Sequence, residues 1–258
     1  MRHIELVKIE HSVKVGDVCG EIQPNITENT VFTVNGEPIG FYLQEIPLRL
    51  RKLIDVANAE FLSERVPKSM MNRTSGEQGL TERVQQFSTI LGSVPPRPHM
   101  KRPYPSISSV HQVASAQTFI KAMLLAAEES ARVIKDIAPA LYDKQKAIIE
   151  EKIPPKYRFG ELFTSSISNF NISASFHRDA GNLEGCANVI IAKKHNARGG
   201  NTTVPDYGAT MDSRDNSMLV YPAWRNVHGV TPIVPTKEGG YRNSLVFYPL
   251  KAFANHWD

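Results

Sequence analysis

Residues 175–182 read SFHRDAGN, in which His177 and Asp179 stand two positions apart. Alternate side chains of a β-strand point to the same face, so this spacing lets an imidazole and a carboxylate bind one ion. With 8 His in 258 residues, an H-x-D pair can also arise by chance. A metal site therefore requires a third ligand from elsewhere in the chain.

The sequence around this stretch is typical of β-structure. From about residue 157 onward, short β-rich runs such as CANVIIAKK and NSLVFYPL alternate with turns. Strands this short and this regularly spaced favour a sandwich or barrel over alternating βαβ units. We therefore expect a C-terminal β-core.

The N-terminal half is predicted to supply helices. Apolar residues recur at helical spacing in residues 46–62 and 119–134, and a shorter helix is expected over residues 141–152. The dipeptide Asn35-Gly36 between alternating apolar residues predicts a tight hairpin. Residues 67–110 are rich in Pro, Ser and Gly, which is typical of a functional lid or a linker. The pattern as a whole indicates an α+β protein.

Composition argues against several classes of protein. No apolar run approaches the roughly 20 residues of a membrane span, so no membrane partner is expected. Cys19 and Cys186 are the only cysteines, which argues against a disulfide framework or a cysteine zinc site and suits a reducing cytoplasm. The formal net charge of +4 allows an anionic partner without requiring one. No P-loop or dinucleotide-binding fingerprint occurs.

The third ligand is expected from RNVHGV, which places His228 at the edge of a later strand. Two histidines and one carboxylate form the facial triad of non-haem Fe(II) oxygenases. The same three groups also form a catalytic zinc site, so the metal stays open at this point.

Downstream, YRNSLVFY places Arg242 and Ser244 two positions apart on one face of a strand. A guanidinium binds a carboxylate with two parallel hydrogen bonds, and a neighbouring hydroxyl can add another. The pair suits the distal carboxylate of 2-oxoglutarate, although an arginine on a strand can also be a simple surface charge.

The order H-x-D, distal His, R-x-S resembles the Fe(II)/2-oxoglutarate dioxygenases, whose fold is a double-stranded β-helix of the jelly-roll or cupin type. HRDAGN, RNVHGV and RNSLVFY are similar to the catalytic segments of the TET/JBP family, over roughly residues 155–253. The chain lacks the cysteine-rich segments of the animal enzymes and resembles the short microbial or viral members. The resemblance implies a single dioxygenase domain over residues 1–258, with residues 1–154 as a helical and loop elaboration of a catalytic core at residues 155–253.

The resemblance also implies the chemistry. Fe(II), 2-oxoglutarate and O2 would hydroxylate the 5-methyl group of a pyrimidine in DNA, with 5-methylcytosine as first choice and thymine as second. The implied iron ligands are His177, Asp179 and His228. The implied contacts to 2-oxoglutarate are Arg242 and Ser244, and those to a flipped base are Asn182 and Tyr248. Leu250 stands where the animal enzymes carry a histidine, which leaves the choice of base open.

DNA phosphates would need basic partners, and two segments are candidates. The first is a predicted turn after the metal strand, with Lys193, Lys194 and Arg198. The second is a Pro-rich loop, with Arg97, Lys101 and Arg102. Such charge runs also occur on solvated surfaces.

Other readings of the sequence remain. The same triad would serve an oxygenase acting on a small molecule, a nucleotide or a protein side chain, and a non-catalytic jelly-roll module is a further alternative. A cytoplasmic location, in a bacterial or a virus-infected host cell, is expected. The oligomeric state is not predicted.

Overall fold

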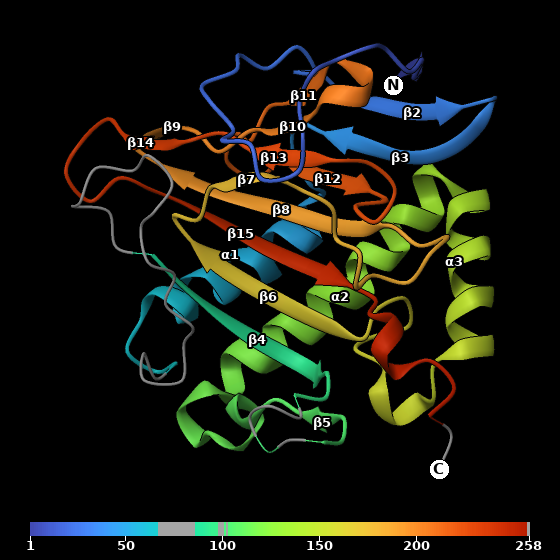
Figure 1. Cartoon of the computed structure of the whole chain (residues 1–258). Coiled ribbons are helices and arrows are strands. Elements are labelled where there is room, and N and C mark those ends of the chain that lie inside the picture. The colour runs from blue at the N-terminus through green and yellow to red at the C-terminus, as the bar shows by residue number, and fades with distance from the viewer. Residues whose placement is uncertain (67–85, 98–100, 102, 257–258) are drawn as a thin grey trace.

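The computed structural model describes residues 1–66, 86–97, 101 and 103–256 (Figure 1). Most of its strands belong to one large sheet, which is antiparallel except where β1 pairs with β2. In spatial order this nine-stranded sheet consists of β1 (Arg2–Glu5), β2 (Thr30–Val34), β3 (Glu37–Leu43), β12 (Met218–Tyr221), β8 (Asn188–His195), β15 (Tyr241–Tyr248), β6 (Ser165–Phe170), β4 (Phe87–Val94) and β5 (Ser106–Ile107).

A smaller sheet lies over part of the large one. Its four strands are, in order, β11 (Ala209–Met211), β10 (Thr202–Val204), β13 (His228–Val230) and β7 (Ala174–His177), and a separate pair joins β14 (Ile233–Pro235) to β9 (Ala197–Gly199). Two facing sheets whose strands alternate along the chain are the jelly-roll arrangement that the resemblance implies.

Helices cover the other face of the large sheet. Figure 1 shows α1 (Leu48–Leu62) and α2 (Gln117–Ile137) behind the sheet, with α3 (Pro139–Lys152) beside α2. Short 3-10 helices lie at Ser109–Gln112, Ala114–Ala116, Pro155–Tyr157, Pro205–Tyr207 and Lys251–Phe253. The predicted helices at residues 46–62, 119–134 and 141–152 are confirmed.

The main hydrophobic core lies between these helices and the large sheet. Leu245 and Phe247 of β15 are fully buried there, against α1 and α2 residues such as Ile54 and Met123. Because alternate residues of a strand point to opposite faces, the other residues of β15 face the small sheet. The core therefore fixes which side chains of β15 reach the space between the sheets.

The N-terminal half contributes strands as well as helices. Asn35 (φ 53°) and Gly36 (φ 77°) make the predicted hairpin between β2 and β3, since both adopt the left-handed conformation that such a turn requires. β1 to β5 all extend the large sheet. Among the described residues, no helix combines the length and the apolar character needed to cross a membrane.

Candidate active site

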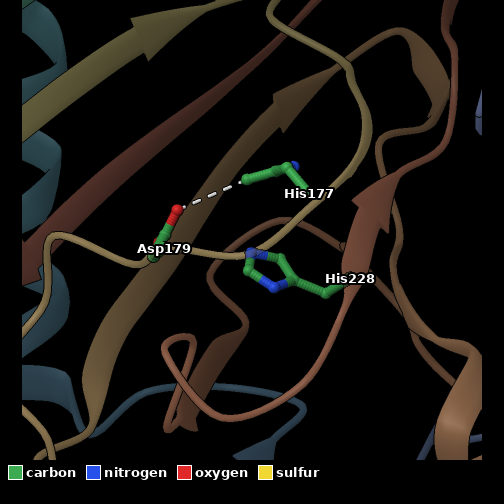
Figure 2. A group of neighbouring side chains, drawn as sticks. All are labelled: His177, Asp179 and His228. Carbon is green, nitrogen blue, oxygen red and sulfur yellow. Dashed lines mark ion pairs between the residues drawn. The ribbon is translucent and has the colours of Figure 1, made fainter. Parts of the chain in front are cut away.

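His177, Asp179 and His228 come together at one end of the small sheet. β7 ends at His177, Asp179 follows two residues later, and β13 begins at His228, directly opposite His177 in the antiparallel register. Their possible ligand atoms all lie within 4.8 Å of one another. His177 Nε2 is 3.4 Å from Asp179 Oδ1 (Figure 2). The three ligands expected from the sequence thus meet at one point.

Hydrogen bonds on the far side of each ring orient the two imidazoles. His177 Nδ1 lies 2.7 Å from the carbonyl oxygen of Ser175, and His228 Nδ1 lies 3.2 Å from that of Asn226. A carbonyl oxygen only accepts, so Nδ1 carries the proton and a neutral ring keeps the Nε2 lone pair for a metal. Two such nitrogens and one carboxylate fit Fe(II), and zinc would accept the same donors.

The three groups shift one another's pKa values. The hydrogen bond with Asp179 raises the pKa of His177. Burial lowers the pKa of His228, and the neighbouring His177 lowers it further. Burial alone would raise the pKa of Asp179, but the hydrogen bond from His177 and the charge of both imidazoles hold it below its ordinary value. The cluster therefore favours an ionised carboxylate at Asp179, as metal binding requires.

A chain of amides fixes the Asp179 carboxylate. Asn188 Nδ2 donates to Asp179 Oδ2 at 3.3 Å, and Asn182 Nδ2 donates to Asn188 Oδ1 at 2.9 Å. A further hydrogen bond from Asn182 helps to lower the pKa of Asp179. Because an ionised carboxylate only accepts hydrogen bonds, the orientation of the side-chain amides of Asn182 and Asn188 is fixed. Oδ1 of Asn182 is then left as an acceptor.

A second chain of polar groups supports His228 from outside. The carbonyl of Asn226 accepts from His228, and the Asn226 side-chain amide donates to Asp206. Asp206 Oδ1 lies 2.6 Å from His11 Nε2, and its backbone carbonyl accepts from Ile9 at 2.8 Å. The N-terminal segment around Ile9 and His11 thus supports, through Asp206 and Asn226, the strand that carries His228.

Replacing Asp206 with Ala is expected to weaken Fe(II) or Mn(II) binding by about tenfold. Hydrogen-bond partners behind metal ligands are worth roughly 10–100-fold in metal affinity, and Asp206 acts through Asn226, so we expect the lower end of that range. Equilibrium dialysis measures the effect, with Asp136→Ala, an exposed carboxylate on α2, as the control. Equal metal affinity in the two variants would contradict the supporting role of Asp206.

The space between the two sheets is a cavity of about 460 Å³. His177, Asp179 and His228 line it from the side of the small sheet. The large sheet contributes alternate residues of β15 and neighbouring residues of β6 and β8, namely Arg242, Ser244, Val246 and Tyr248, with Ile167, Asn169, Asn188 and Ile190. Asn182 also lines the cavity. All seven residues predicted for iron, 2-oxoglutarate and base therefore share one cavity.

Arg242 is a buried cation, with 3% of its surface exposed. Within the described part of the chain, its guanidinium makes one hydrogen bond, from Nε to Ser213 Oγ at 2.9 Å, and no ion pair. Burial lowers the pKa of Arg242 to about 10, which keeps it protonated at neutral pH. A buried charge without a counter-ion costs free energy, so the site is suited to an anionic ligand. Ser244 accepts from Asn169 Nδ2 at 3.2 Å and lines the same cavity.

Gly200 packs directly on the Arg242 side chain. Its φ is +73°, and a Cβ added there would lie 3.0 Å from both Cδ and Nε of Arg242. A larger residue at position 200 must therefore displace either the turn or the guanidinium.

Gly200→Ala is expected to lower the free energy of unfolding by about 2 kcal/mol, of which roughly half is left-handed backbone strain and the rest crowding against Arg242. Gly239 is a matched control because it has the same φ of +73° and nothing within 4 Å of an added Cβ. Thermal or denaturant unfolding of Gly200→Ala and Gly239→Ala separates the two effects. Equal losses in both variants would mean that Arg242 does not constrain position 200.

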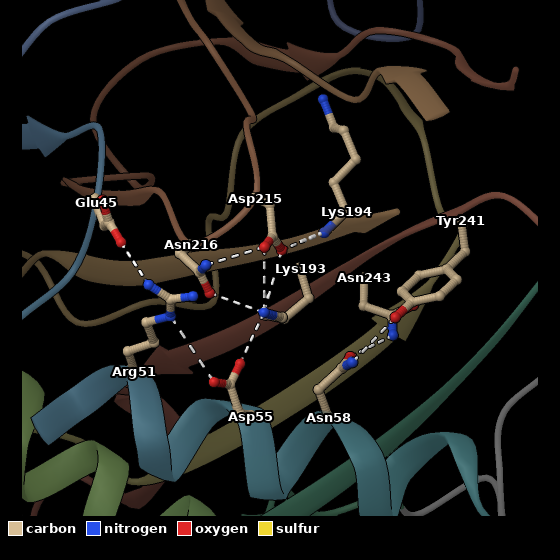
Figure 3. Close-up of polar contacts among 10 residues, drawn as sticks. All are labelled: Glu45, Arg51, Asp55, Asn58, Lys193, Lys194, Asp215, Asn216, Tyr241 and Asn243. Atoms are coloured by element: carbon tan, nitrogen blue, oxygen red, sulfur yellow. Dashed lines mark hydrogen bonds and ion pairs between the residues drawn. The ribbon is translucent and has the colours of Figure 1, made fainter. Parts of the chain in front are cut away.

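The prediction that Lys193 and Lys194 stand in a turn is wrong. Both belong to β8, and their side chains point to opposite faces of the sheet (Figure 3). Lys193 Nζ lies 2.8 Å from Asp55 and 3.2 Å from Asp215. Lys194 Nζ donates to the carbonyl of Gly199 at 2.7 Å. This arrangement does not resemble an open phosphate-binding patch.

The other predicted DNA contacts are scattered. Arg198 is exposed and forms an ion pair with Glu21 at 3.0 Å. Lys101 is exposed, and Arg102 lies outside the described residues. Burial raises the pKa of Tyr248, whereas the charge of Arg97 acts to lower it.

Sequence reasoning missed three residues of the site. Asn188 holds Asp179, Ser213 holds Arg242, and Asp206 supports Asn226. Asn188 carried a signal, since it is a polar residue at an inward position of the apolar run CANVIIA. Ser213 and Asp206 lie outside the strands, where periodicity carries no information on the direction of a side chain.

A jelly-roll cavity with two histidines and a carboxylate on one wall and a buried arginine on the other is characteristic of Fe(II)/2-oxoglutarate-dependent dioxygenases. Residues 97–251 match the Tet_JBP family, described as the oxygenase domain of the 2OGFeDO superfamily, and the chain belongs to this family. It is therefore a dioxygenase that uses Fe(II), 2-oxoglutarate and O2, which decides between iron and zinc.

A solved structure shares the fold of this chain. NgTET1, solved in complex with 5mC DNA, superposes with a TM-score of 0.62 at 12% identity, over 96% of this chain and 86% of that one. A protein of Caulobacter crescentus described as a 2OG-Fe(II) oxygenase family protein gives a TM-score of 0.46 at 14% identity, over 81% of this chain and 76% of that one. No curated protein sequence matches the chain.

Proposed function

We propose that this enzyme hydroxylates the 5-methyl group of a pyrimidine in DNA, with 5-methylcytosine as the first choice of substrate and thymine as the second. The products would be the 5-hydroxymethyl base, succinate and CO2. Membership of the Tet_JBP family and the fold shared with NgTET1, a protein solved with 5mC DNA, support the substrate class. The observation that carries the choice of base is the acceptor left on Asn182 beside Asp179.

In this proposal His177, Asp179 and His228 hold Fe(II), while Arg242 and Ser244 hold 2-oxoglutarate. Bound Fe(II), with 2-oxoglutarate and O2, supplies the oxidative chemistry that converts a methyl C–H bond to an alcohol. The two terminal nitrogens of Arg242 suit the distal carboxylate of 2-oxoglutarate, and the Ser244 hydroxyl can add a hydrogen bond.

The orientation of Asn182 favours cytosine over thymine. Its amide nitrogen is occupied by Asn188, and its position is fixed through Asp179, so its oxygen is the group that a base can meet. Cytosine presents an amino donor at position 4, whereas thymine presents a carbonyl acceptor there. An acceptor facing an acceptor is unfavourable, so 5-methylcytosine is the better partner for Asn182.

Access to a methyl group in a duplex requires the base to leave the stack. The cost is about a few kcal/mol, which stacking and edge hydrogen bonds in the pocket can offset. Tyr248 lines the cavity and is our candidate for the stacking contact. Arg97, whose charge acts on Tyr248, is the candidate for a nearby phosphate.

The decisive experiment incubates the protein with Fe(II), 2-oxoglutarate and ascorbate on DNA that contains 5-methylcytosine, followed by digestion and mass spectrometry of the nucleosides. Hydroxymethylcytosine that is absent with Asp179→Ala would support the proposal. Hydroxymethyluracil from thymine would keep the chemistry and contradict the choice of base.

An oxygenase acting on a small molecule, a nucleotide or a protein side chain is the alternative, since the same cavity chemistry would serve it. Succinate release that does not depend on DNA, together with unmodified nucleosides, would favour this alternative. Comparing methylated DNA with free 5-methyldeoxycytidine separates a nucleotide substrate from a polymer.

A further inference from the structure

Two cations lie side by side on the cavity face of the large sheet. In the antiparallel pairing of β8 with β15, Lys194 is directly opposite Arg242. Paired residues of adjacent strands point to the same face. Figure 3 shows Lys193 directed at α1 and Lys194 directed away from it, which is the strand alternation that puts Lys194 on the side of Arg242.

A double-glycine turn encloses both side chains. Lys194 Nζ donates to the carbonyl oxygen of Gly199 at 2.7 Å. The next residue, Gly200, packs on Arg242, with an ideal Cβ position 3.0 Å from its Cδ and Nε. Both glycines have positive φ, 76° and 73°. The turn therefore holds the ammonium and the guanidinium in a fixed arrangement.

Nearby carboxylates balance these charges incompletely. Burial and, after it, the charge of Arg242 lower the pKa of Lys194 to about 8, although Asp212 and Asp215 act to raise it. Asp215 also lies 3.2 Å from Lys193, so its negative charge is divided between the two lysines. In the described part of the chain neither Lys194 nor Arg242 forms an ion pair with a carboxylate. An anion bound at Arg242 would relieve the repulsion between the two cations.

We propose that Lys194 is a second cation of the 2-oxoglutarate site, which strengthens the binding of the distal carboxylate by Arg242 and makes that binding depend on pH. The inference rests on the proposed role of Arg242. Lys194 is absent from the cavity wall, so it acts on the co-substrate through its charge and through Arg242, as a positioning residue.

The sign of the pH dependence follows from the lowered pKa. Below pH of about 8 the side chain of Lys194 is charged and attracts the carboxylate. Above it the free protein loses this charge, so affinity for 2-oxoglutarate falls as pH rises. A bound carboxylate favours the charged lysine, and binding near pH 8 is therefore expected to take up a proton.

The test is calorimetric titration of 2-oxoglutarate into the Mn(II)-loaded protein, from about pH 6.5 to about pH 9.5, with no DNA present. Lys194→Gln is expected to weaken binding by about fivefold to tenfold at pH 7, to lose the decline near pH 8, and to take up no proton. Lys194→Arg should retain the affinity and hold it to higher pH. Lys237→Gln removes an exposed cation from the loop between β14 and β15 and should leave binding unchanged.

Unchanged affinity and pH dependence in Lys194→Gln, with thermal unfolding showing a folded protein, would overturn the inference while leaving the site at Arg242 intact. If the wild-type protein bound no 2-oxoglutarate, the proposed site itself would fail, and this inference with it. Binding of 2-oxoglutarate in this titration, together with unmodified nucleosides in the separate DNA assay, would contradict only the proposed substrate.

Discussion

Replacing His177 with Ala is expected to abolish Fe(II)-dependent succinate release, with a loss of more than about 100-fold. Residues that only orient a metal ligand are typically worth about 10–100-fold in metal affinity or activity, and loss of a ligand should exceed that range. The variant also removes the hydrogen bond that lowers the pKa of Asp179, so proton competition for the carboxylate increases. Succinate release measures the loss of turnover, and Mn(II) affinity measures the loss of metal binding.

The control is His195→Ala. His195 is an exposed histidine at the end of β8, hydrogen-bonded to its neighbour Asn196. It tests whether losing any histidine of the large sheet affects turnover, and we expect activity close to that of the unmodified enzyme. A His177→Ala variant that released succinate normally would remove the metal assignment of the whole cluster.

The residues predicted for iron and co-substrate do gather in one cavity, and strand periodicity carries part of that information. Residues two positions apart on a strand share a face, which placed Arg242 and Ser244 in one cavity. Asp179 lies two residues beyond the end of β7, and it still meets His177 there. His228 followed from the known order of motifs along the chain, and the antiparallel register then set it opposite His177. Local spacing was sufficient for Arg242 and Ser244 because both lie on the regular strand β15, whereas His228 lies on a different strand from His177 and needed the order of motifs.

The same periodicity explains the error at Lys193 and Lys194. A run of basic residues suggested a shared exposed surface, but the strand continues through both of them and sends them to opposite faces. One lysine then binds acidic groups of α1 and a loop, and the other lies beside Arg242. Where β8 ends depends on its pairing with β15, which local sequence does not encode.

Long-range polar partners were also invisible in the sequence. Asp206 and Asn226 are 20 residues apart, and His11 reaches Asp206 from 195 residues away. Neither spacing corresponds to a secondary-structure period. Only the packing of the N-terminal segment against the small sheet brings these groups together.

Arg242→Met is expected to raise the KM for 2-oxoglutarate by about 100-fold or more while leaving the free energy of unfolding unchanged or higher. Losing one partner of a buried, hydrogen-bonded charge pair costs about 2–5 kcal/mol in binding, and the upper part of this range exceeds 100-fold. Stability should respond in the opposite direction, because a buried charge replaced by an apolar side chain of similar volume is often neutral or stabilising. Arg242 has no carboxylate partner among the described residues, so this protein bears the cost of burial without a compensating ion pair.

Arg132→Met, which breaks a surface ion pair with Glu129 on α2, is the control and should change neither quantity by much. A KM increase well below the expected one, in a variant that is less stable than the unmodified protein, would mean that Arg242 serves the fold. A large KM increase in a variant of equal or greater stability would mean that the guanidinium is retained for its ligand.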